Sequence, residues 1–174
     1  MKKSKAKPMS VNCSEQSSIK MQITRLDLCV EGLARCVASL NEELFLGKLG
    51  NWSPRDILAH LIGWNRYIIE GSKQIMRREL PFYDVDPGED YSKVNAVLVS
   101  EYSSRDKQEL LDELMASAEE LKKFLQTLNA GQWERDYGVR HQGATLTIQN
   151  TVADLIEDYV HHARQIEDWA KRQV

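Results

Sequence analysis

Apolar residues recur at alternating spacings of four and three along four separate segments of this chain. The first segment keeps the alternation without a break, at Ile19, Ile23, Leu26, Val30, Leu33, Val37, Leu40 and Leu44. Residues at these spacings lie along one stripe of an α-helix that packs lengthwise against neighbouring helices. We therefore expect one continuous helix here, ended by Gly47 and Gly50.

A strong helix start follows at Ser53-Pro54-Arg55-Asp56. Serine is a favoured N-cap, proline suits the first helical position, and an acid three residues after the cap completes a capping box. We expect this second helix to end near Leu80-Pro81. Its apolar stripe comprises Ile57, Leu61, Trp64, Ile68 and Ile75.

Two further helical regions complete the pattern. Residues 91–128 form the third, which we expect to break or to be capped again at Ser103-Ser104, and residues 147–171 form the fourth. Residues 81–88 are expected to form a loop, and residues 132–146 are irregular. The sequence thus predicts an all-α four-helix bundle, whose long second and third connections leave room for a crossover.

The composition is typical of one globular domain. The chain has 174 residues, of which 42% are hydrophobic and 28% charged, which suffices for a single core. Residues 1–17 are polar, rich in Ser and Lys and aperiodic, so we expect a disordered tail there. Residues 18–174 are expected to form the domain.

Charge and cysteine content limit the partners and the compartment. The net charge of −3 predicts no nucleic-acid partner, because such partners favour a large basic surface. No run of about eighteen apolar residues is present, which predicts no membrane partner, and the basic N-terminus lacks the apolar segment of a secretory signal. The three cysteines form no CxxC motif, so reduced thiols and a cytoplasmic location are the simplest interpretation.

Two histidines and an aspartate are the candidate metal ligands. Asp158 and His162 lie about 40° apart on a helical wheel, and His162 occupies the apolar stripe of the last helix. His60 flanks the stripe of the second helix. One carboxylate and two imidazoles on two helices form a three-ligand set that can hold a divalent metal and leave positions open for water or substrate. A shared cation would also satisfy three polar groups that are costly to bury alone.

The helical wheel separates this set from the adjacent Glu157 and His161. His161 lies about 100° from His162 and off the apolar stripe, so Glu157 and His161 are expected to form a solvated pair. A structural alternative fits the same sequence. In it, His60 is a hydrogen-bonded core histidine, and Asp158 and His162 share a plain intrahelical hydrogen bond.

Other polar and aromatic residues have two interpretations each. Asp56, one turn before His60, is either an acceptor that orients the His60 imidazole or only the acid of the capping box. His141 is either a surface loop residue or part of a lid. Three aromatic residues either wall a substrate pocket or serve helix packing: Trp64, Tyr67 and Tyr159.

Two motifs carry a resemblance to a known family. The segment from Trp52 to Trp64 resembles the second helix of the DinB-like (YfiT-type) four-helix-bundle superfamily, and the segment His162-Ala-Arg-Gln-Ile resembles a His-x-x-Gln-Ile pattern in its last helix. The resemblance follows the helix order over most of residues 18–172. It implies metal ligands at His60 and His162, with the remaining ligand at Asp158. Many members have His at that last position, and the mycothiol-dependent maleylpyruvate isomerases have Glu.

The resemblance also implies a function. It points to a divalent ion, commonly zinc or nickel, to a bundle that often forms a homodimer, and in some members to chemistry on low-molecular-weight thiols. We therefore expect a metal-dependent hydrolase or thiol S-transferase that acts on a small molecule through an activated water or thiol.

Two alternatives to an enzyme remain open at the level of sequence. Residues 58–64, Leu-Ala-His-Leu-Ile-Gly-Trp, are also similar to the ClbS-like bundles, which protect against a cyclopropane-bearing genotoxin. That likeness implies a bundle that binds a toxin or another electrophile without an essential metal. The other alternative is an interaction protein whose bundle merely dimerises.

Overall fold

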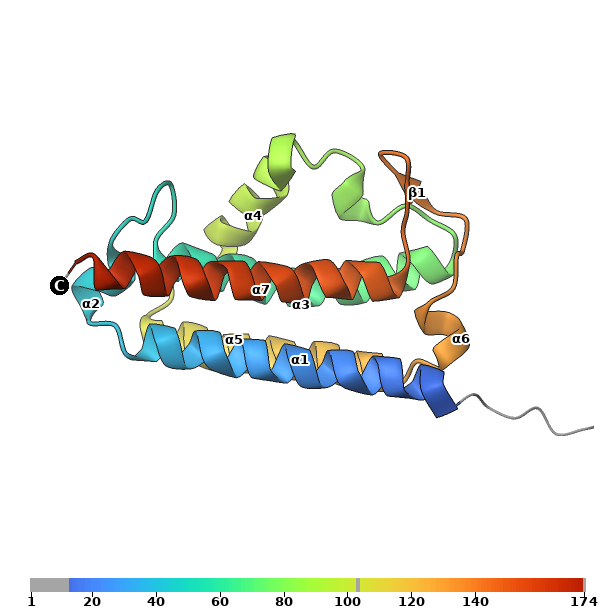
Figure 1. Cartoon of the computed structure of the whole chain (residues 1–174). Coiled ribbons are helices and arrows are strands. Elements are labelled where there is room, and N and C mark those ends of the chain that lie inside the picture. Colours follow the sequence, from blue (N-terminus) through green and yellow to red (C-terminus); the bar gives the residue numbers. More distant parts are fainter. Residues whose placement is uncertain (1–12, 103, 174) are drawn as a thin grey trace, which may run out of the picture.

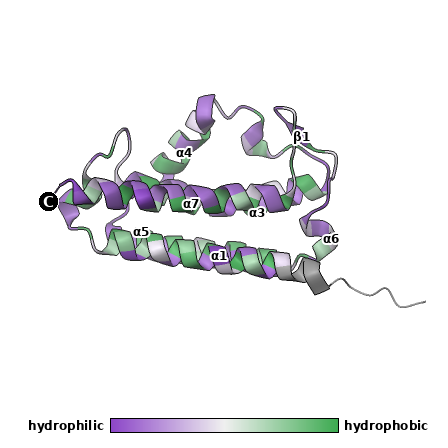
Figure 2. Cartoon of the chain, in the orientation of Figure 1, coloured by the Kyte–Doolittle hydropathy of each residue, from purple (hydrophilic) through white to green (hydrophobic). Residues whose placement is uncertain are grey.

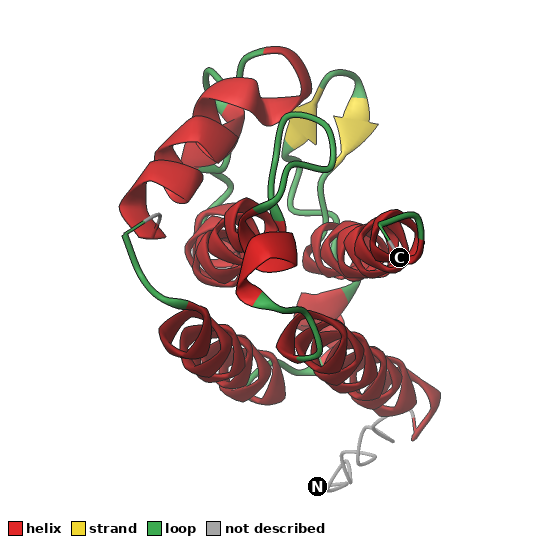
Figure 3. Ribbon diagram, turned by 90° about the vertical axis from the view of Figure 1, so that its left-hand side faces the viewer, coloured by secondary structure: helices red, strands yellow, loops and turns green. Residues whose placement is uncertain are grey.

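The computed structural model describes residues 13–102 and 104–173. Four long helices account for most of these residues: α1 (Cys13–Ala38), α3 (Pro54–Met76), α5 (Lys107–Gln126) and α7 (Ile148–Lys171). Seen end-on, they occupy the four corners of a square bundle (Figure 3). The predicted all-α four-helix bundle is confirmed.

The connection between α3 and α5 is the crossover for which the sequence left room. It contains two 3-10 turns, η1 (Phe82–Asp84) and η2 (Glu89–Tyr91), followed by the helix α4 (Ser92–Tyr102). Figure 1 shows this connection passing back along the bundle, outside the pair α3 and α7, so that α3 and α5 run in the same direction. Gly63 permits a close approach of α4, because a Cβ at this position would lie 2.4 Å from Leu98 Cδ2.

Each long helix packs by one apolar stripe. Hydrophobic and hydrophilic residues are interleaved along every long helix, as amphipathic packing requires (Figure 2). Fully buried aliphatic residues come from all four, including Leu33 of α1, Leu61 of α3, Leu121 of α5 and Val152 of α7. Among the described residues, no helix combines the length and the apolar character needed to cross a membrane.

The first predicted helix is divided in two. α1 ends at Ala38, and the short helix α2 (Glu42–Leu46) begins after Asn41, whose side chain accepts a hydrogen bond from the Leu44 amide at 2.8 Å. Leu40 lies in the break between α1 and α2 but is still buried against the core, so the apolar residues keep their regular spacing across the break. Periodicity alone therefore could not reveal the new N-cap.

Other boundaries differ from the prediction as well. Residues 1–12 of the predicted tail lie outside the described part of the chain, but α1 already begins at Cys13, before the predicted boundary. Asp106, and not a serine, caps α5 through a capping box with Glu109. The irregular stretch contains the short helix α6 (Ala130–Trp133) and a hairpin of two two-residue strands, β1 (Arg140–His141) and β2 (Ala144–Thr145).

Candidate metal centre

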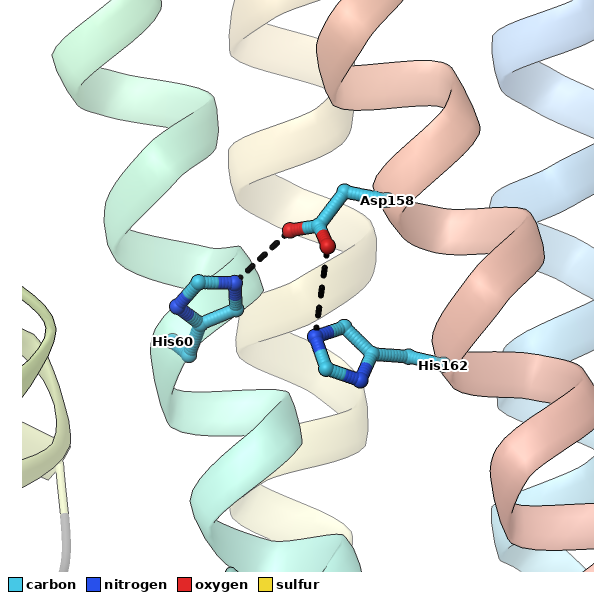
Figure 4. A group of neighbouring side chains, drawn as sticks. All are labelled: His60, Asp158 and His162. Atoms are coloured by element: carbon cyan, nitrogen blue, oxygen red, sulfur yellow. Dashed lines mark hydrogen bonds and ion pairs between the residues drawn. The ribbon is translucent and has the colours of Figure 1, made fainter. Parts of the chain in front are cut away.

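The three predicted metal ligands meet between α3 and α7. His60 Nε2 lies 2.8 Å from Asp158 Oδ2, and His162 Nε2 lies 3.4 Å from Asp158 Oδ1. Figure 4 shows the carboxylate between the two imidazoles, each facing one of its oxygens. One ligand atom from each residue can be chosen so that all three lie within 4.8 Å of one another. The side-by-side packing of two helices thus brings together residues 98 positions apart in sequence.

Asn95 orients the His60 ring from α4. The Trp64 indole N–H and His60 Nδ1 each lie 3.0 Å from Asn95 Oδ1. Because an indole nitrogen can only donate, the Asn95 atom it meets is the amide oxygen, and His60 Nδ1 must carry a proton to donate to the same atom. In the neutral imidazole, Nε2 therefore keeps its lone pair toward Asp158.

Gln165 has the corresponding role for the second imidazole. His162 Nδ1 lies 3.0 Å from Gln165 Oε1, one turn further along α7. Burial lowers the pKa of His162, although the charge of Asp158 opposes this effect, so the ring favours its neutral form. With the Nδ1 proton donated to Gln165, the Nε2 lone pair of His162 also faces Asp158.

The carboxyl group of Asp158 is ionised at neutral pH. Burial alone would raise its pKa, but the hydrogen bond with His60 and the nearby His162 outweigh burial, so the pKa lies below its usual range. Its side chain is 36% exposed, whereas those of His60 and His162 are 5% and 10% exposed. The centre is therefore closed on the helix side and open on the side of the carboxylate.

The arrangement of these donor atoms fits a bound cation. With a proton on Nε2, His60 donates a hydrogen bond to the Asp158 carboxylate; without that proton, the Nε2 lone pairs of both imidazoles and the carboxylate oxygens converge on one position that a cation can occupy. Zinc ligands at about 2.0–2.2 Å in tetrahedral geometry lie about 3.3 Å from one another. His60 and His162 lie 2.8 and 3.4 Å from different oxygens of Asp158, and one ligand atom from each residue lies within 4.8 Å of the other two. The amide oxygens of Asn95 and Gln165 supply the outer hydrogen bonds that metal-ligating histidines usually make.

Trp52 packs over both imidazoles and was not predicted as a site residue. Its ring centroid lies 4.8 Å from that of His60 and 5.8 Å from that of His162. It precedes the N-cap Ser53, so the start of α3 fixes its position. Its place in the Trp52–Trp64 motif was the only sequence signal, since tryptophan before a helix is usually explained by packing.

A cavity of about 490 Å³ opens beside His60 and Asp158. Trp64 lines it, together with Tyr83 and Tyr91 from the crossover connection. Trp64 stands edge-on to both tyrosines, with ring centroids 5.1 and 5.4 Å apart. The volume suits a small organic molecule.

The other two predicted pocket residues do not line this cavity. Tyr159 is fully buried, and its hydroxyl exchanges hydrogen bonds with the Asn65 amide, so it belongs to the bundle core. Tyr67 lies one layer further out, with its ring against Trp64 and Phe82. A helical wheel shows the direction in which a side chain points, but it cannot show which other element fills the space there.

Asp56 completes the capping box of α3 and does not contact His60. It accepts hydrogen bonds from the Ser53 amide at 2.9 Å and from Lys48 Nζ at 2.6 Å. Burial acts to raise its pKa, but these hydrogen bonds outweigh burial and leave the pKa below its usual range. Of the two roles considered for Asp56, the structure supports the capping role, and Asn95 takes the orienting role.

His141 does not line the cavity but contacts Tyr91 and Asp84 of the crossover connection. Its Nδ1 lies 3.5 Å from Asp84 Oδ1, and the same oxygen accepts a hydrogen bond from the Tyr91 hydroxyl at 2.7 Å. The Asp84 carboxylate is buried, and burial raises its pKa even though Tyr91 and His141 act in the opposite direction. These contacts tie the β1–β2 hairpin to the crossover connection.

The residues that the wheel excluded are exposed. Glu157 and His161 both lie at the surface, but Glu157 pairs with Arg25 of α1 at 2.9 Å. Cys29 and Cys36 are free thiols, and burial raises the pKa of each, which favours the unreactive thiol form.

The fold and the sequence agree with one family. The family model described as the DinB superfamily matches residues 25–166. The chain belongs to the DinB superfamily. The match covers α3 and α5 completely and most of α7, begins within α1, and includes His60, Asp158 and His162. No curated protein gives a significant sequence match.

Solved structures of the DinB fold resemble the chain at low identity. An uncharacterised protein from Escherichia coli UTI89 has a TM-score of 0.70 at 17% identity, covering 89% of this chain and 94% of that one. The colibactin self-resistance protein ClbS, in complex with a dsDNA, has a TM-score of 0.72 at 13% identity, covering 88% and 95%. The mycothiol-dependent maleylpyruvate isomerase has a TM-score of 0.68 at 16% identity, and the match covers 85% of this chain and 60% of that one.

The prediction of no nucleic-acid partner is wrong, because ClbS of the same fold was crystallised with double-stranded DNA. Total charge was too coarse a basis for that prediction. A net charge of −3 sums over the whole chain and leaves the local distribution of basic side chains open.

Proposed function

We propose that this DinB-superfamily protein is a divalent-metal-dependent enzyme that acts on a small molecule. His60, Asp158 and His162 would hold the ion, and zinc or nickel suits two imidazoles and a carboxylate. The reaction would be a hydrolysis or the transfer of a low-molecular-weight thiol.

The convergence of two imidazole Nε2 atoms on one ionised carboxylate carries this proposal. Asn95 and Gln165 each accept the Nδ1 proton of one histidine, which leaves Nε2 of both rings directed at Asp158. Donor sets that are held by outer hydrogen bonds in this way are typical of metal centres.

The chain's own residues would confine and orient the substrate. The ligands come from α3 and α7 only, so the side facing the cavity stays open for a reactant. A divalent ion bound there lowers the pKa of a water or thiol toward neutrality. Trp52 shields the centre from one side, and the aromatic wall of Trp64, Tyr83 and Tyr91 would hold the apolar part of a substrate.

Metal analysis of the full chain, purified without a histidine tag, tests the proposal. We expect stoichiometric zinc or nickel in the natural protein and a drop in metal affinity of more than about 100-fold in His162→Ala, because loss of a direct ligand exceeds the loss of an outer partner. His161→Ala is the matched control, since it removes an exposed imidazole from the adjacent position. Equal metal content in both variants would overturn the proposal.

A second candidate function is the capture of a reactive small molecule without a metal. The aromatic wall of the cavity and the likeness in fold to ClbS favour it. A thermal-shift screen of metal-free protein against thiols and apolar electrophiles distinguishes the two functions, because a ligand stabilises the folded state by mass action. Stabilisation that is independent of metal supports capture, and stabilisation that requires the ion supports the enzyme.

The remaining expectations stay predictions. A homodimer is expected from the family resemblance, and sedimentation of the full chain tests it. A cytoplasmic location is expected from the cysteine pattern, and fractionation of the source cells tests it.

A further inference from the structure

The cavity beside the metal centre has an unbalanced charge. Carboxylates from α7 and from the crossover connection line it, namely Asp90, Asp154, Glu157 and Asp158. Among the described residues, no lysine or arginine lines it. A surface of this kind is unfavourable for an anionic ligand and attracts a cation.

Two of these carboxylates have no partner of their own. Asp158 belongs to the metal centre, and Glu157 pairs with Arg25. Within the described residues, the side chains of Asp90 and Asp154 have neither an ion pair nor a hydrogen bond. Burial raises the pKa of Asp154, as expected for a partly desolvated carboxylate without a counter-charge.

The position of these carboxylates suits a ligand that also reaches the metal. Asp154 precedes Asp158 by four residues on α7, so the two share one face of the helix, one turn apart. Asp90 comes from η2, on the crossover connection. Asp90 and Tyr91 both have positive φ, of 49° and 57°, a backbone conformation that non-glycine residues rarely adopt and that is often found at ligand sites.

The aromatic wall offers the second element of cation recognition. The rings of Trp64, Tyr83 and Tyr91 form one connected edge-to-face group in the lining of the same cavity. Aromatic faces attract organic ammonium groups, and their edges and faces accommodate an apolar body. An apolar cavity with unpaired carboxylates at its edge therefore matches a molecule that has an apolar part and a positive charge.

We propose that the cavity selects a small organic cation, an ammonium compound with an apolar or aromatic body, as the substrate of the metal centre. The role of this cation as a substrate rests on the function proposed above, whereas the preference of the cavity for a cation does not depend on that function. The ammonium group would lie near Asp90 and Asp154, the body against the aromatic wall, and the remaining end toward His60 and Asp158.

Three probes of nearly equal size test this preference: 2-phenylethylammonium, the neutral 2-phenylethanol and the anionic phenylacetate. Titration calorimetry on the full-length, metal-loaded protein would measure each dissociation constant. We expect the ammonium probe to bind about tenfold more tightly than the alcohol, the effect of one charge-assisted hydrogen bond. Because the carboxylate of phenylacetate can also bind a metal ion, this probe is compared in metal-free protein, where we expect it to bind most weakly. An alcohol that binds as tightly as the ammonium, or phenylacetate that does so in metal-free protein, would overturn the proposal.

Substitutions then locate the preference. In the double variant Asp90→Asn with Asp154→Asn we expect the ammonium-to-alcohol ratio to approach one, while alcohol binding stays unchanged. Asparagine tolerates the left-handed backbone at position 90. Asp168→Asn is the control, because Asp168 is an exposed acid of the same helix that does not line this cavity. A ratio that the double variant leaves intact would overturn the proposal.

The two proposals fail in different ways. If the protein binds no metal but still prefers the ammonium probe, only the proposal of a metal-dependent enzyme is overturned. If the protein binds stoichiometric metal but shows no preference for the ammonium probe, only the proposal of cation selectivity is overturned. Because each ratio compares two probes on the same protein, a general loss of stability in a variant does not imitate either result.

Discussion

The α1–α5 layer and the α3–α7 layer of the bundle bury different kinds of residue. On the first layer the fully buried positions are mainly aliphatic, such as Leu33 and Leu121. On the second layer, His60, Asn65 and His162 are buried among the aliphatic residues. Both layers follow the same apolar spacing, but the two buried imidazoles lie only in the second among the described residues. The difference suggests that one layer supplies stability while the other gives up apolar packing for a polar centre.

The largest expected effect tests the stabilising role of the aliphatic layer. Leu121→Ala should lower the free energy of unfolding by about 2–5 kcal/mol, because it removes fully buried carbon atoms and leaves a cavity. Urea unfolding measures the change. Metal content of the folded variant should stay as in the natural protein. A variant that keeps its stability but loses metal would show that the two layers are not separable in this way.

The next effect sharpens the role of the polar layer. Asn95→Ala should weaken metal binding about 10- to 100-fold, because His60 loses the acceptor that fixes its ring and tautomer. Competition with a chelator of known affinity measures it. Val97→Ala serves as the control on the same helix, since Val97 is 57% exposed. Equal affinities in the two variants would indicate that Asn95 only supports the indole of Trp64.

The smallest effect concerns the start of α3 and depends on pH. Asp56→Asn should cost about 1 kcal/mol of stability at pH 7, because the amide keeps the shape of the cap but loses the charge that faces Lys48. The folded-state pKa of Asp56 lies below its usual value, so its stabilisation is present above the unfolded-state pKa of about 3.9. It is lost as the pH falls through the folded-state pKa.

Urea unfolding at pH 7, 5 and 3 checks this dependence. The difference in the free energy of unfolding between the natural protein and the variant should have its full size at pH 7 and at pH 5, and it should be smaller at pH 3. A gap of constant size would assign the effect to hydrogen-bond geometry instead of charge. Metal binding should be unaffected in either case, because Asp56 does not contact His60.

Much of the His60–Asp158–His162 cluster was predictable because it depends on one helical wheel and one capping signal. Asp158 and His162 share a face of α7 whatever surrounds that helix, and Ser53 with Asp56 fixes where α3 begins. The partners of the ligands were not predictable. Asn95 reaches His60 from α4 across the crossover connection, and Trp52 covers both rings, and no local pattern connects these positions.

Local patterns in the sequence were enough to predict the helical stripes, the capping box of α3 and the turn of α7 that displays Asp158 with His162, because these depend on residues within a few positions of one another. The packing of the whole chain was needed to show that Asn95 orients His60, that Tyr159 belongs to the core and not to the cavity, and that carboxylates from two distant segments line one cavity. Such contacts depend on how helices pack and on the path of a long connection, and both follow from the sum of many weak interactions over the whole chain.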